Sequence, residues 1–326
     1  MSDSSGPYNV FLIGCGAIAG GYDGADTVSP DLVQTHAKTF TLHEAFRVVG
    51  CYDPDPEKVQ YFAKTWDIKY IATDLETAFR DLKVDVVCIC SPTEFHRQQL
   101  KFLLDKNVRL VLCEKPLTDG IEGSREIIRQ YAECPIALTV NYLRRWNEAF
   151  LSLSDRIKSG EFGELQRGTG WYNKGLYNNG SHMVDLFRMF FGDLTVTHAG
   201  NIQYDFWPTD PTLNAGLRTC KDKPLHLAGT DVGHFQFFEF RLIMEKAVID
   251  MVDFGNRLVL RLAGPGGMPA RKAETIETGR ERTFLQLAEN LEGYFTRGEA
   301  LKCPAEDAVK TLEVCAAIRQ KVGVSA

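Results

Sequence analysis

Long hydrophobic runs are missing from this 326-residue sequence. No apolar stretch reaches the roughly 18–20 residues that a membrane-spanning helix needs, and residues 1–7 lack the basic and hydrophobic pattern of a secretory signal. Blocks of lysine and arginine are missing too, and the net charge is −6, which argues against the basic surface of a nucleic-acid-binding protein. We therefore expect a cytoplasmic protein that binds neither membranes nor nucleic acids.

Metal-binding spacings of cysteine and histidine are absent as well. The nine cysteines include no Cys-x-x-Cys pair, and no histidine or cysteine partner lies at zinc spacing from them. Their number is odd, and Cys51, Cys88, Cys90 and Cys113 lie inside apolar runs. This pattern is typical of buried free thiols in a reducing compartment, so we expect no metal site.

Short apolar runs, each closed by turn residues, alternate with helical segments in the first part of the chain. Runs of this length are typical of parallel strands buried on both faces. The expected strands are Val10–Ile13, Phe46–Tyr52, Val84–Cys90, Val108–Cys113 and Ile136–Tyr142, and the expected helices are Pro56–Trp66, Thr93–Lys106 and Asp119–Tyr131. The last helix opens with Asp119 and Glu122, a variant of the capping box. The alternation predicts an α/β fold in which residues 1–143 form a doubly wound, Rossmann-type dinucleotide-binding domain.

Residues 144–326 have a different pattern, which predicts a second domain for substrate binding and oligomerisation. Alternating apolar and polar residues are typical of an antiparallel sheet with one covered face, and two amphipathic helices, Phe284–Phe295 and Ala305–Lys321, close the chain. The expected strands are Leu165–Tyr172, Leu194–Phe206, His234–Ile243, Ala247–Asp253 and Arg257–Leu262. We therefore expect a C-terminal α/β domain with a large, mostly antiparallel sheet.

A glycine-rich turn, Gly14-x-Gly16-x-x-Ala19, follows the first expected strand. The first glycine permits a tight turn, the second lets a pyrophosphate approach the backbone, and the small Ala19 allows a helix to pack closely on the strand. The residues expected to hold a dinucleotide at this turn are Gly14, Gly16, Ala17, Ile18 and Ala19. Residues 21–34 are polar and contain glycine and proline, which predicts an inserted loop where the first helix would otherwise begin.

Asp53 ends the second expected strand, where a carboxylate can accept hydrogen bonds from both hydroxyls of an adenine ribose. Such a carboxylate repels a 2′-phosphate, so NAD(H) is the preferred cofactor, with NADP(H) possible. Asp53 lies further from the glycines than the motif expects, and the inserted loop accounts for that distance. The alternative role for Asp53 is to cap the helix after Pro54, and the two roles are compatible.

The next two strands end in further candidates for the cofactor site. Ser91-Pro92-Thr93 follows one of them, and its proline would stiffen the turn beneath a nicotinamide. His96 is expected to cap or pack the helix that follows. Glu114-Lys115-Pro116 ends the next strand, and Lys115 lies between an apolar run and a rigid proline on the same sheet edge as the glycines, which makes it a candidate catalytic cation. The expected cofactor contacts at these ends are Ser91, Pro92, Thr93, His96, Glu114 and Lys115.

A polar segment before a very apolar helix in the second domain carries the remaining candidates. His182 lies at the start of that helix and is a natural acid or base at neutral pH, although a structural role is also open. Asp185, one turn later, could orient the imidazole or favour the N-terminal end of the helix. The candidate contacts for an anionic group of the substrate are Lys174, Arg144 and Arg145.

Together these residues resemble the glucose-fructose oxidoreductase / inositol dehydrogenase / MocA (Gfo/Idh/MocA) family over nearly the whole chain. The resemblance rests on the glycine turn, Asp53, Ser91-Pro92-Thr93-x-x-His96, Glu114-Lys115-Pro116 and Gly180-x-His182-x-x-Asp185. It implies a nicotinamide cofactor, a sugar or polyol substrate between Lys115 and His182, and homodimers or homotetramers formed through the exposed face of the second sheet. The family often has aspartate four residues before the histidine, where this sequence has Asn178, which can orient groups but cannot relay a proton.

The resemblance implies an NAD(P)-dependent oxidoreductase that moves a hydride between nicotinamide and a hydroxyl or ketone carbon of a sugar derivative, such as a nucleotide-linked or acidic sugar. Lys115 would polarise the reacting oxygen, and His182 would exchange the hydroxyl proton. Asn178 and Asn179 would position these groups or the sugar. Two alternatives stay open, a non-catalytic sensor of a dinucleotide or sugar with the same fold, and a reductase of a non-sugar carbonyl.

Overall fold

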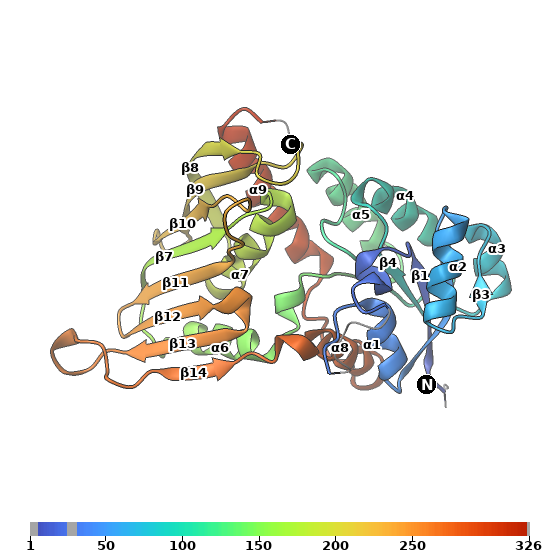
Figure 1. Ribbon diagram of the computed structural model, residues 1–326, viewed down its shortest axis with the longest axis horizontal. Coiled ribbons are helices and arrows are strands. Elements are labelled where there is room, and N and C mark those ends of the chain that lie inside the picture. Colours follow the sequence, from blue (N-terminus) through green and yellow to red (C-terminus); the bar gives the residue numbers. More distant parts are fainter. Residues whose placement is uncertain (1–5, 25–30, 325–326) are drawn as a thin grey trace. The chain divides into compact units, whose positions relative to one another are not determined.

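The computed structural model describes residues 6–24 and 31–324, which form two compact units (Figure 1). The first unit comprises Met1–Trp146 and Glu281–Val309, and the second comprises Asn147–Arg280 and Lys310–Ala326. The boundary predicted after residue 143 lies close to the first passage between the units. The later return of the chain to the first unit is not predicted from the sequence.

The sheet of the first unit is parallel throughout. Its strands are β1 (Tyr8–Ile13), β2 (Phe46–Tyr52), β3 (Tyr70–Ile71), β4 (Val86–Ile89), β5 (Leu110–Cys113) and β6 (Ala137–Val140). They pair in the order β3-β2-β1-β4-β5-β6, so the strand order reverses between β1 and β4. Every residue of β4 and β5 is buried, which explains their continuous apolar sequences. The predicted Rossmann-type fold is confirmed, and the two-residue β3 is too short to leave a sequence signal.

Helices cover this sheet and complete its core. They are α1 (His36–Leu42), α2 (Pro56–Thr65), α3 (Leu75–Asp81), α4 (Thr93–Leu103), α5 (Ile121–Ala132) and, from the returning segment, α8 (Thr283–Arg297). The α2 helix begins at Pro56 because the carboxylate of Asp55 accepts hydrogen bonds from the backbone N–H groups of Glu57 and Lys58. The α8 helix packs beside α1 and contributes Leu287 and Leu291 to the core.

Helix α1 begins well after the glycine turn, and α5 begins at a different residue from the predicted one. A single π-helical turn, η1 (Ala17–Gly21), follows the glycines, and α1 begins only at His36. The described residues between them form turns and loop, as the predicted insertion requires, and its residues 25–30 lie outside the described ones. The capping box predicted at Asp119 and Glu122 is wrong, because α5 begins after Gly120, which makes no side-chain cap.

The second unit contains an eight-stranded, mostly antiparallel sheet. Its strands are β7 (Leu165–Tyr172), β8 (Leu194–Gln203), β9 (Thr212–Thr219), β10 (Pro224–Gly229), β11 (Glu239–Met244), β12 (Ala247–Val252), β13 (Arg257–Leu262) and β14 (Glu274–Glu277). They pair in the order β14-β13-β12-β11-β7-β10-β9-β8, and β7 and β10 form the parallel pair. The predicted C-terminal sheet is confirmed, although β9, β10 and β14 were not predicted, and β11 begins at Glu239 rather than at His234.

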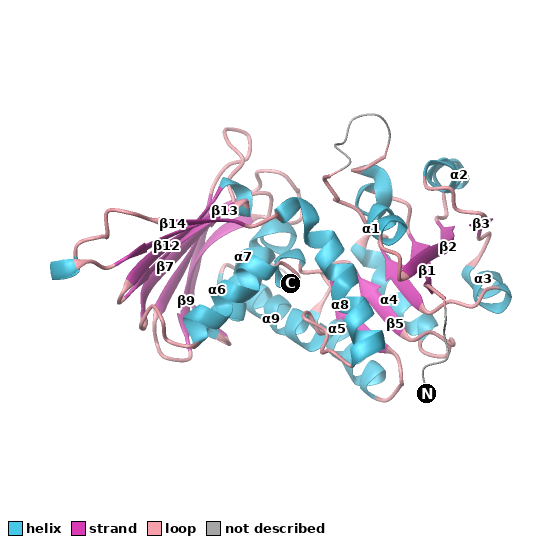
Figure 2. Ribbon diagram, turned by 90° about the horizontal axis from the view of Figure 1, so that it is seen from below, coloured by secondary structure: helices cyan, strands magenta, loops and turns pink. Residues whose placement is uncertain are grey.

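Helices α6 (Glu148–Lys158), α7 (Ser181–Phe191) and α9 (Ala305–Lys321) lie against one face of this sheet (Figure 2). Phe190 of α7 packs edge-on against Phe240 of β11, with ring centroids 5.7 Å apart. Buried and more exposed side chains alternate along β11, so the opposite face of the sheet is open to solvent. Among the described helices, none combines the length and the apolar character needed to cross a membrane.

Candidate active site

The glycine turn after β1 has the geometry of a phosphate cradle. Gly14 has a φ of +91°, and a Cβ atom there would lie 2.5 Å from the backbone nitrogen of Ser91, so no other residue fits. A Cβ at Gly16 would meet nothing within 4 Å, which leaves the backbone open to an approaching group. Ala19 is fully buried. These three positions fit the roles that a dinucleotide pyrophosphate requires.

A cavity of about 480 Å³ lies beside this turn in the first unit, where the strand order reverses. Ligands of doubly wound sheets bind at such a reversal point. The cavity is lined by Ile13, Gly14, Tyr52, Asp53, Pro54, Lys58, Asp74, Leu75, Glu76, Ser91, Pro92, Phe95, Gln98, Gln99 and Phe102. The structure therefore brings four of the predicted cofactor residues, Gly14, Asp53, Ser91 and Pro92, around one space.

Asp53 lines this cavity although it is only 7% exposed, and its carboxylate is already hydrogen-bonded. Oδ2 accepts from the backbone nitrogen of Cys15 at 2.8 Å and from Nζ of Lys58 at 2.9 Å, and Oδ1 accepts from the backbone nitrogen of Asp55 at 3.1 Å. Burial alone would raise the pKa of Asp53, but these donors outweigh it and hold the pKa below its usual value. The cap of the following helix is Asp55, not Asp53.

Glu114 anchors the end of β5 through a network that the sequence does not reveal. Its Oε1 accepts hydrogen bonds from Nε2 of His36 and from Nδ2 of Asn141, each at 2.7 Å. Oδ1 of Asn141 accepts in turn from the indole nitrogen of Trp146 at 2.9 Å. Burial would raise the pKa of Glu114, but the contacts with His36 and Asn141 lower it below the usual value. Glu114, whose side chain is 13% exposed, is thus a hydrogen-bonded anchor for the neighbouring Lys115, which is half-buried.

His96 contacts both the loop after β4 and the loop after β5, which carry predicted cofactor residues. Its Nε2 lies 2.9 Å from the carbonyl oxygen of Ser91, and its Nδ1 lies 3.0 Å from that of Pro116. The side chain is 1% exposed. His96 therefore holds the loops after β4 and β5 together, which agrees with its expected packing role, while Thr93 forms the first residue of α4 after Pro92.

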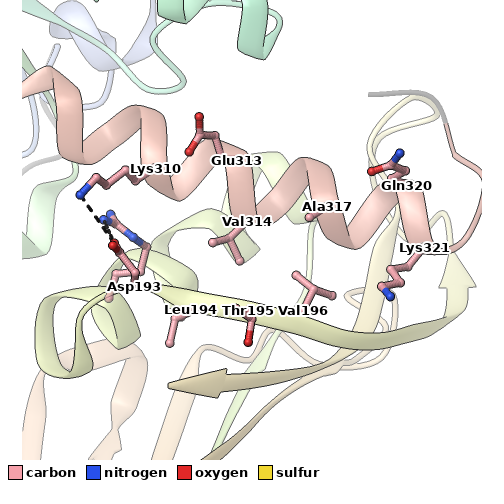
Figure 3. Close-up of a pocket in the computed structure, with 11 residues that line it drawn as sticks. Asp193, Leu194, Thr195, Val196, Lys310, Glu313, Val314, Ala317, Gln320 and Lys321 are labelled. Carbon is pink, nitrogen blue, oxygen red and sulfur yellow. Dashed lines mark hydrogen bonds and ion pairs between the residues drawn. The ribbon is translucent and has the colours of Figure 1, made fainter. Parts of the chain in front are cut away.

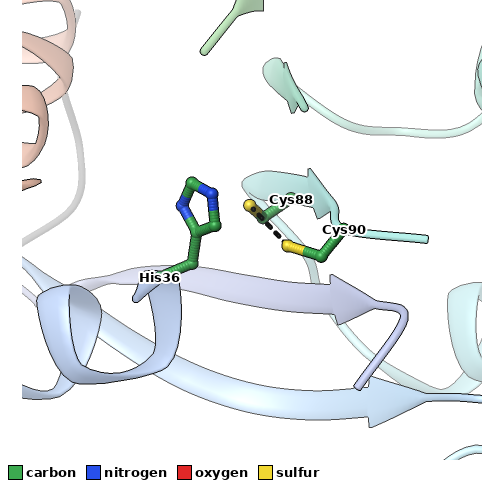
Figure 4. Close-up of side chains that lie close together, drawn as sticks. All are labelled: His36, Cys88 and Cys90. Atoms are coloured by element: carbon green, nitrogen blue, oxygen red, sulfur yellow. Dashed lines mark hydrogen bonds between the residues drawn. The ribbon is translucent and has the colours of Figure 1, made fainter. Parts of the chain in front are cut away.

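The same region contains a cluster of side chains that could ligate a metal. Ligand atoms of His36, Cys88 and Cys90 lie within 4.8 Å of one another, and the two sulfur atoms are 3.5 Å apart (Figure 4). All three residues are buried. Burial raises the pKa of Cys88 well above its usual value, and Nε2 of His36 is bound to Glu114. The three side chains thus lie packed together in the core of the first unit.

In the second unit, two aspartates fix the loop that precedes α7. Asp210 accepts from the backbone nitrogens of Tyr177 and Asn178 at 2.9 and 2.8 Å, and Asp205 accepts from that of Lys174 at 2.9 Å. Gly175 has a φ of +88°, and a Cβ there would overlap the carboxylate of Asp210. Neither aspartate was predicted, because each lies some thirty residues beyond the loop that it holds.

The predicted substrate residues have different surroundings. Asn178 and Asn179 lie in the π-helical turn η3 (Leu176–Gly180), where the amide of Asn178 donates to the carbonyl oxygen of Lys174 at 3.0 Å. Nζ of Lys174 lies 5.2 Å from the ring centre of Phe206. His182 is the second residue of α7 and is half-buried.

Other predicted groups have structural contacts. Asp185 is buried and accepts from Oγ1 of Thr311 at 3.0 Å. Arg145 is 6% exposed and pairs with Asp307 at 2.9 Å. Because it is buried in this ion pair, we no longer propose Arg145 as a substrate contact. Arg144 lies beside it in the short helix η2 (Leu143–Arg145) and is half-buried.

A second cavity, of about 550 Å³, lies between α9 and the start of β8 (Figure 3). Asp193 on its rim pairs with Arg188 at 3.3 Å and with Lys310 at 3.7 Å. No residue that the sequence predicts for cofactor or substrate lines this cavity.

Most of the first unit matches a known protein family. Residues 8–142 match the family described as "Oxidoreductase family, NAD-binding Rossmann fold" (GFO_IDH_MocA). The match to this family thus covers the predicted dinucleotide-binding domain. The glycine turn, Asp53 and Glu114-Lys115-Pro116 all lie inside the matched residues, so the resemblance inferred from these motifs is confirmed.

Relatives of this GFO_IDH_MocA domain include dehydrogenases. Inositol 2-dehydrogenase 2 of Mycolicibacterium vanbaalenii is 32% identical over 160 residues, which are 45% of this chain and 46% of the relative. The chain thus matches less than half the length of that curated relative.

Solved structures resemble nearly the whole chain. An oxidoreductase from Agrobacterium radiobacter in complex with NAD+, L-tartaric acid and magnesium has a TM-score of 0.76 at 16% identity and 96% coverage of both chains. A 3-ketoreductase from Actinomadura kijaniata in complex with NADP has a TM-score of 0.77 at 16% identity and 97% coverage of both. At these identities the likeness establishes the fold.

Proposed function

We propose that this protein is an NAD(P)-dependent oxidoreductase that acts on a hydroxyl or ketone carbon of a sugar or a related polyol. The observation that carries the proposal is the cavity at the glycine turn, with Lys115 at the end of the neighbouring β5 strand. The inositol 2-dehydrogenase relative and the 3-ketoreductase neighbour favour a cyclic polyol or a sugar ketone as the substrate class.

The side chains divide the chemistry between a cation and an imidazole. A bound nicotinamide would supply or accept the hydride. The ammonium of Lys115 would stabilise negative charge on the reacting oxygen, with Glu114 holding the strand end beneath it. His182, half-buried at the start of α7, would take or return the hydroxyl proton.

The loop before α7 would orient the substrate. The amide of Asn178 is tied to Lys174, so we assign Asn178 a positioning role and no part in proton transfer. Lys174 and Arg144 are the candidate contacts for an anionic substituent, and Asn179 is a candidate hydrogen-bonding partner for a substrate hydroxyl. A carbonyl substrate that is not a sugar would use the same groups.

The test is the change in NADH absorbance on a panel of cyclic polyols, sugars and their ketones. We expect at least one of them to be turned over, and Lys115→Ala to lose most turnover while dinucleotide binding is retained. Lys69→Ala is the matched control, because the Lys69 side chain is 81% exposed and pairs with a surface aspartate. Dinucleotide binding without turnover on any substrate would favour the sensor alternative, and unchanged turnover in Lys115→Ala would remove Lys115 from the mechanism.

Self-association through the open face of the second sheet is part of the proposal. Trp171 of β7 and Phe237 lie edge-on there with ring centroids 6.4 Å apart, and the Phe235 side chain next to them is 68% exposed. An aromatic surface of this kind is typical of an interface. Light scattering on the purified protein should give a homodimer or homotetramer, and Phe235→Lys should shift it toward the monomer.

A further inference from the structure

Three loops of the second unit lie at one edge of its sheet. Gly229 at the end of β10 pairs with Tyr172 at the end of β7, and Gln203 at the end of β8 pairs with Thr212 at the start of β9. Because β9 runs antiparallel to β10, these strand ends share one edge. The loops that follow β7, β8 and β10 there are residues 173–180, 204–211 and 230–238. The first loop leads directly into α7, so His182 lies at the same edge.

Asp205 joins these three loops through its carboxylate. Oδ2 accepts hydrogen bonds from the backbone nitrogen of Lys174 at 2.9 Å and from that of Val232 at 3.2 Å. Oδ1 accepts from Oγ1 of Thr212 at 2.6 Å. The loops therefore form one connected surface beside the start of α7.

The loop between β8 and β9 exposes three large aromatic side chains on this surface. The exposed fractions are 56% for Tyr204, 50% for Phe206 and 47% for Trp207. The rings of Phe206 and Trp207 lie nearly perpendicular, at 85°, with their centroids 4.9 Å apart. Adjacent exposed aromatic side chains are typical of a surface that a ligand or a partner covers.

The charges of this surface favour an uncharged ligand. The permanently charged side chains of the three loops, and of α9 where it contacts them, are Lys174, Asp205, Asp210, Asp231 and Arg319. Carboxylates outnumber cations in this set, so the surface would repel the diphosphate of a nucleotide-linked sugar. It would not repel a neutral ring.

Lys174 can serve an uncharged ligand as a hydrogen-bond donor. Its Nζ lies 5.2 Å from the ring centre of Phe206, and among the described residues it forms no ion pair with a carboxylate. An ammonium has three N–H donors. A hydroxyl group next to a ring stacked on the aromatic side chains could therefore accept a hydrogen bond from Lys174.

We propose that the aromatic loop, residues 204–207, is a subsite for a second, uncharged ring joined to the sugar that reacts at His182. That ring is a neutral sugar or an aryl group. Either can stack on an aromatic side chain, because the weakly positive C–H groups of a sugar face, or the edge of an aryl ring, are attracted to the negative π face. The substrate is then a neutral glycoside. This rests on the proposed function, and it changes the expected partner of Lys174 from an anionic substituent to a hydroxyl.

The experiment measures dissociation constants by calorimetry in the presence of NADH for two series of probes. One series is glucose, phenyl β-D-glucoside, cellobiose and UDP-glucose, and the other is galactose, phenyl β-D-galactoside, lactose and UDP-galactose. In at least one series, we expect the phenyl glycoside or the disaccharide to bind at least about fivefold tighter than the free sugar, as one aromatic stacking contact provides. The phenyl glycoside and the disaccharide distinguish an aryl group from a second sugar. The UDP-sugar should bind no tighter than the free sugar.

Substitutions of an exposed side chain connect this gain to the aromatic loop. Trp207→Ala should abolish the gain and change the constants for the free sugar and for NADH by less than about twofold, which also shows that the variant is folded. Trp207→Phe keeps a ring and should retain most of the gain. Tyr61→Ala is the matched control, because it removes a 63% exposed aromatic side chain from α2 and should change none of the constants.

Several outcomes would contradict the subsite and leave the proposed function in place. They are tightest binding of a UDP-sugar, equal binding of free sugars and neutral glycosides, and no binding of any of the probes while NADH still binds. A further one is a Trp207→Ala variant whose assembly changes mass in light scattering while every constant stays the same, because the aromatic loop would then be an interface between copies. Failure of NADH binding together with sugar turnover would instead remove the proposed function.

Discussion

Nε2 of the fully buried His36 lies 2.7 Å from Oε1 of Glu114, although the two residues are 78 positions apart in the sequence. Asn141 donates to the same oxygen and accepts from Trp146. The network therefore joins α1 to the ends of β5 and β6. It also includes Trp146, the last residue before the chain enters the second unit. Because Lys115 follows Glu114 directly, the position of the proposed catalytic cation depends on these buried contacts.

Replacing His36 by phenylalanine tests the strength of this network. The variant keeps an aromatic ring but removes a donor to the partly buried carboxylate of Glu114, so we expect the free energy of unfolding to fall by about 3 kcal/mol. Denaturant unfolding measures the change. The exposed His234 provides the control, and His234→Phe should stay within about 0.5 kcal/mol of the wild type. Equal stability of the two variants would contradict the role given to the Glu114 contact.

The same network predicts a pH dependence of stability. The pKa of Glu114 is lowered from its usual 4.5 in the folded state, so its contribution is present above that value and is lost as the pH falls. Burial alone would lower the pKa of His36, but Cys90 and Glu114 raise it above its usual 6.5. The contribution of His36 to the free energy of unfolding is therefore lost as the pH rises through the raised pKa. The stability difference between wild type and Glu114→Gln should therefore be greatest between about pH 4.5 and 6.5. A difference that grows steadily toward pH 9 would contradict this sign.

Two glycine substitutions should separate folding from cofactor binding. Gly14→Ala places a Cβ at a φ of +91° and against the backbone of Ser91, so we expect a loss of about 3 kcal/mol in unfolding free energy. Gly16→Ala meets nothing within 4 Å, so its stability should change by less than about 1 kcal/mol. Its methyl group would occupy the phosphate cradle and weaken NADH binding by at least about tenfold. Unfolding curves and calorimetry with NADH check both outcomes, and unimpaired NADH binding by Gly16→Ala would place the cofactor elsewhere.

Asp210 should affect turnover without affecting the dinucleotide. Asp210→Asn replaces one of the oxygens that hold the loop before α7, so we expect kcat to fall by about tenfold with an unchanged Kd for NADH. Asp222→Asn, whose side chain is 87% exposed, is the matched control. Steady-state kinetics with a substrate found in the panel would measure the effect. A change in the Kd for NADH instead would show that Asp210 acts on the first unit.

Much of the fold could be predicted because buried parallel strands leave continuous apolar runs. The strands from β1 to β6 show this, apart from the two-residue β3. In the second unit, β9, β10 and β14 were not predicted. Burial does not alternate along β9 or β14, and the alternation along β10 extends over only six residues. The start of α5 was misplaced because the capping pattern at Asp119 is present in the sequence but unused in the structure.

The candidate site was predictable where one short segment carries the chemistry, as at Gly14 and Asp53. It was not predictable where partners are distant in the sequence. The contact between Lys58 and Asp53 was not predicted, because a lysine near a helix start is usually exposed to solvent and only the structure places its ammonium beside the carboxylate. Arg145 was included because its charge is visible in the sequence and its burial against Asp307 is not.

The return of α8 to the first unit has a consequence for how the protein is made. Phe295 stacks on Tyr8 of β1 with ring centroids 4.4 Å apart, and Leu287 and Leu291 complete the core of that unit. The ribosome adds these residues only after all eight strands of the second sheet have been synthesised. The core of the first unit therefore cannot be completed during synthesis until nearly the entire chain has been translated, and part of its apolar surface stays uncovered until then.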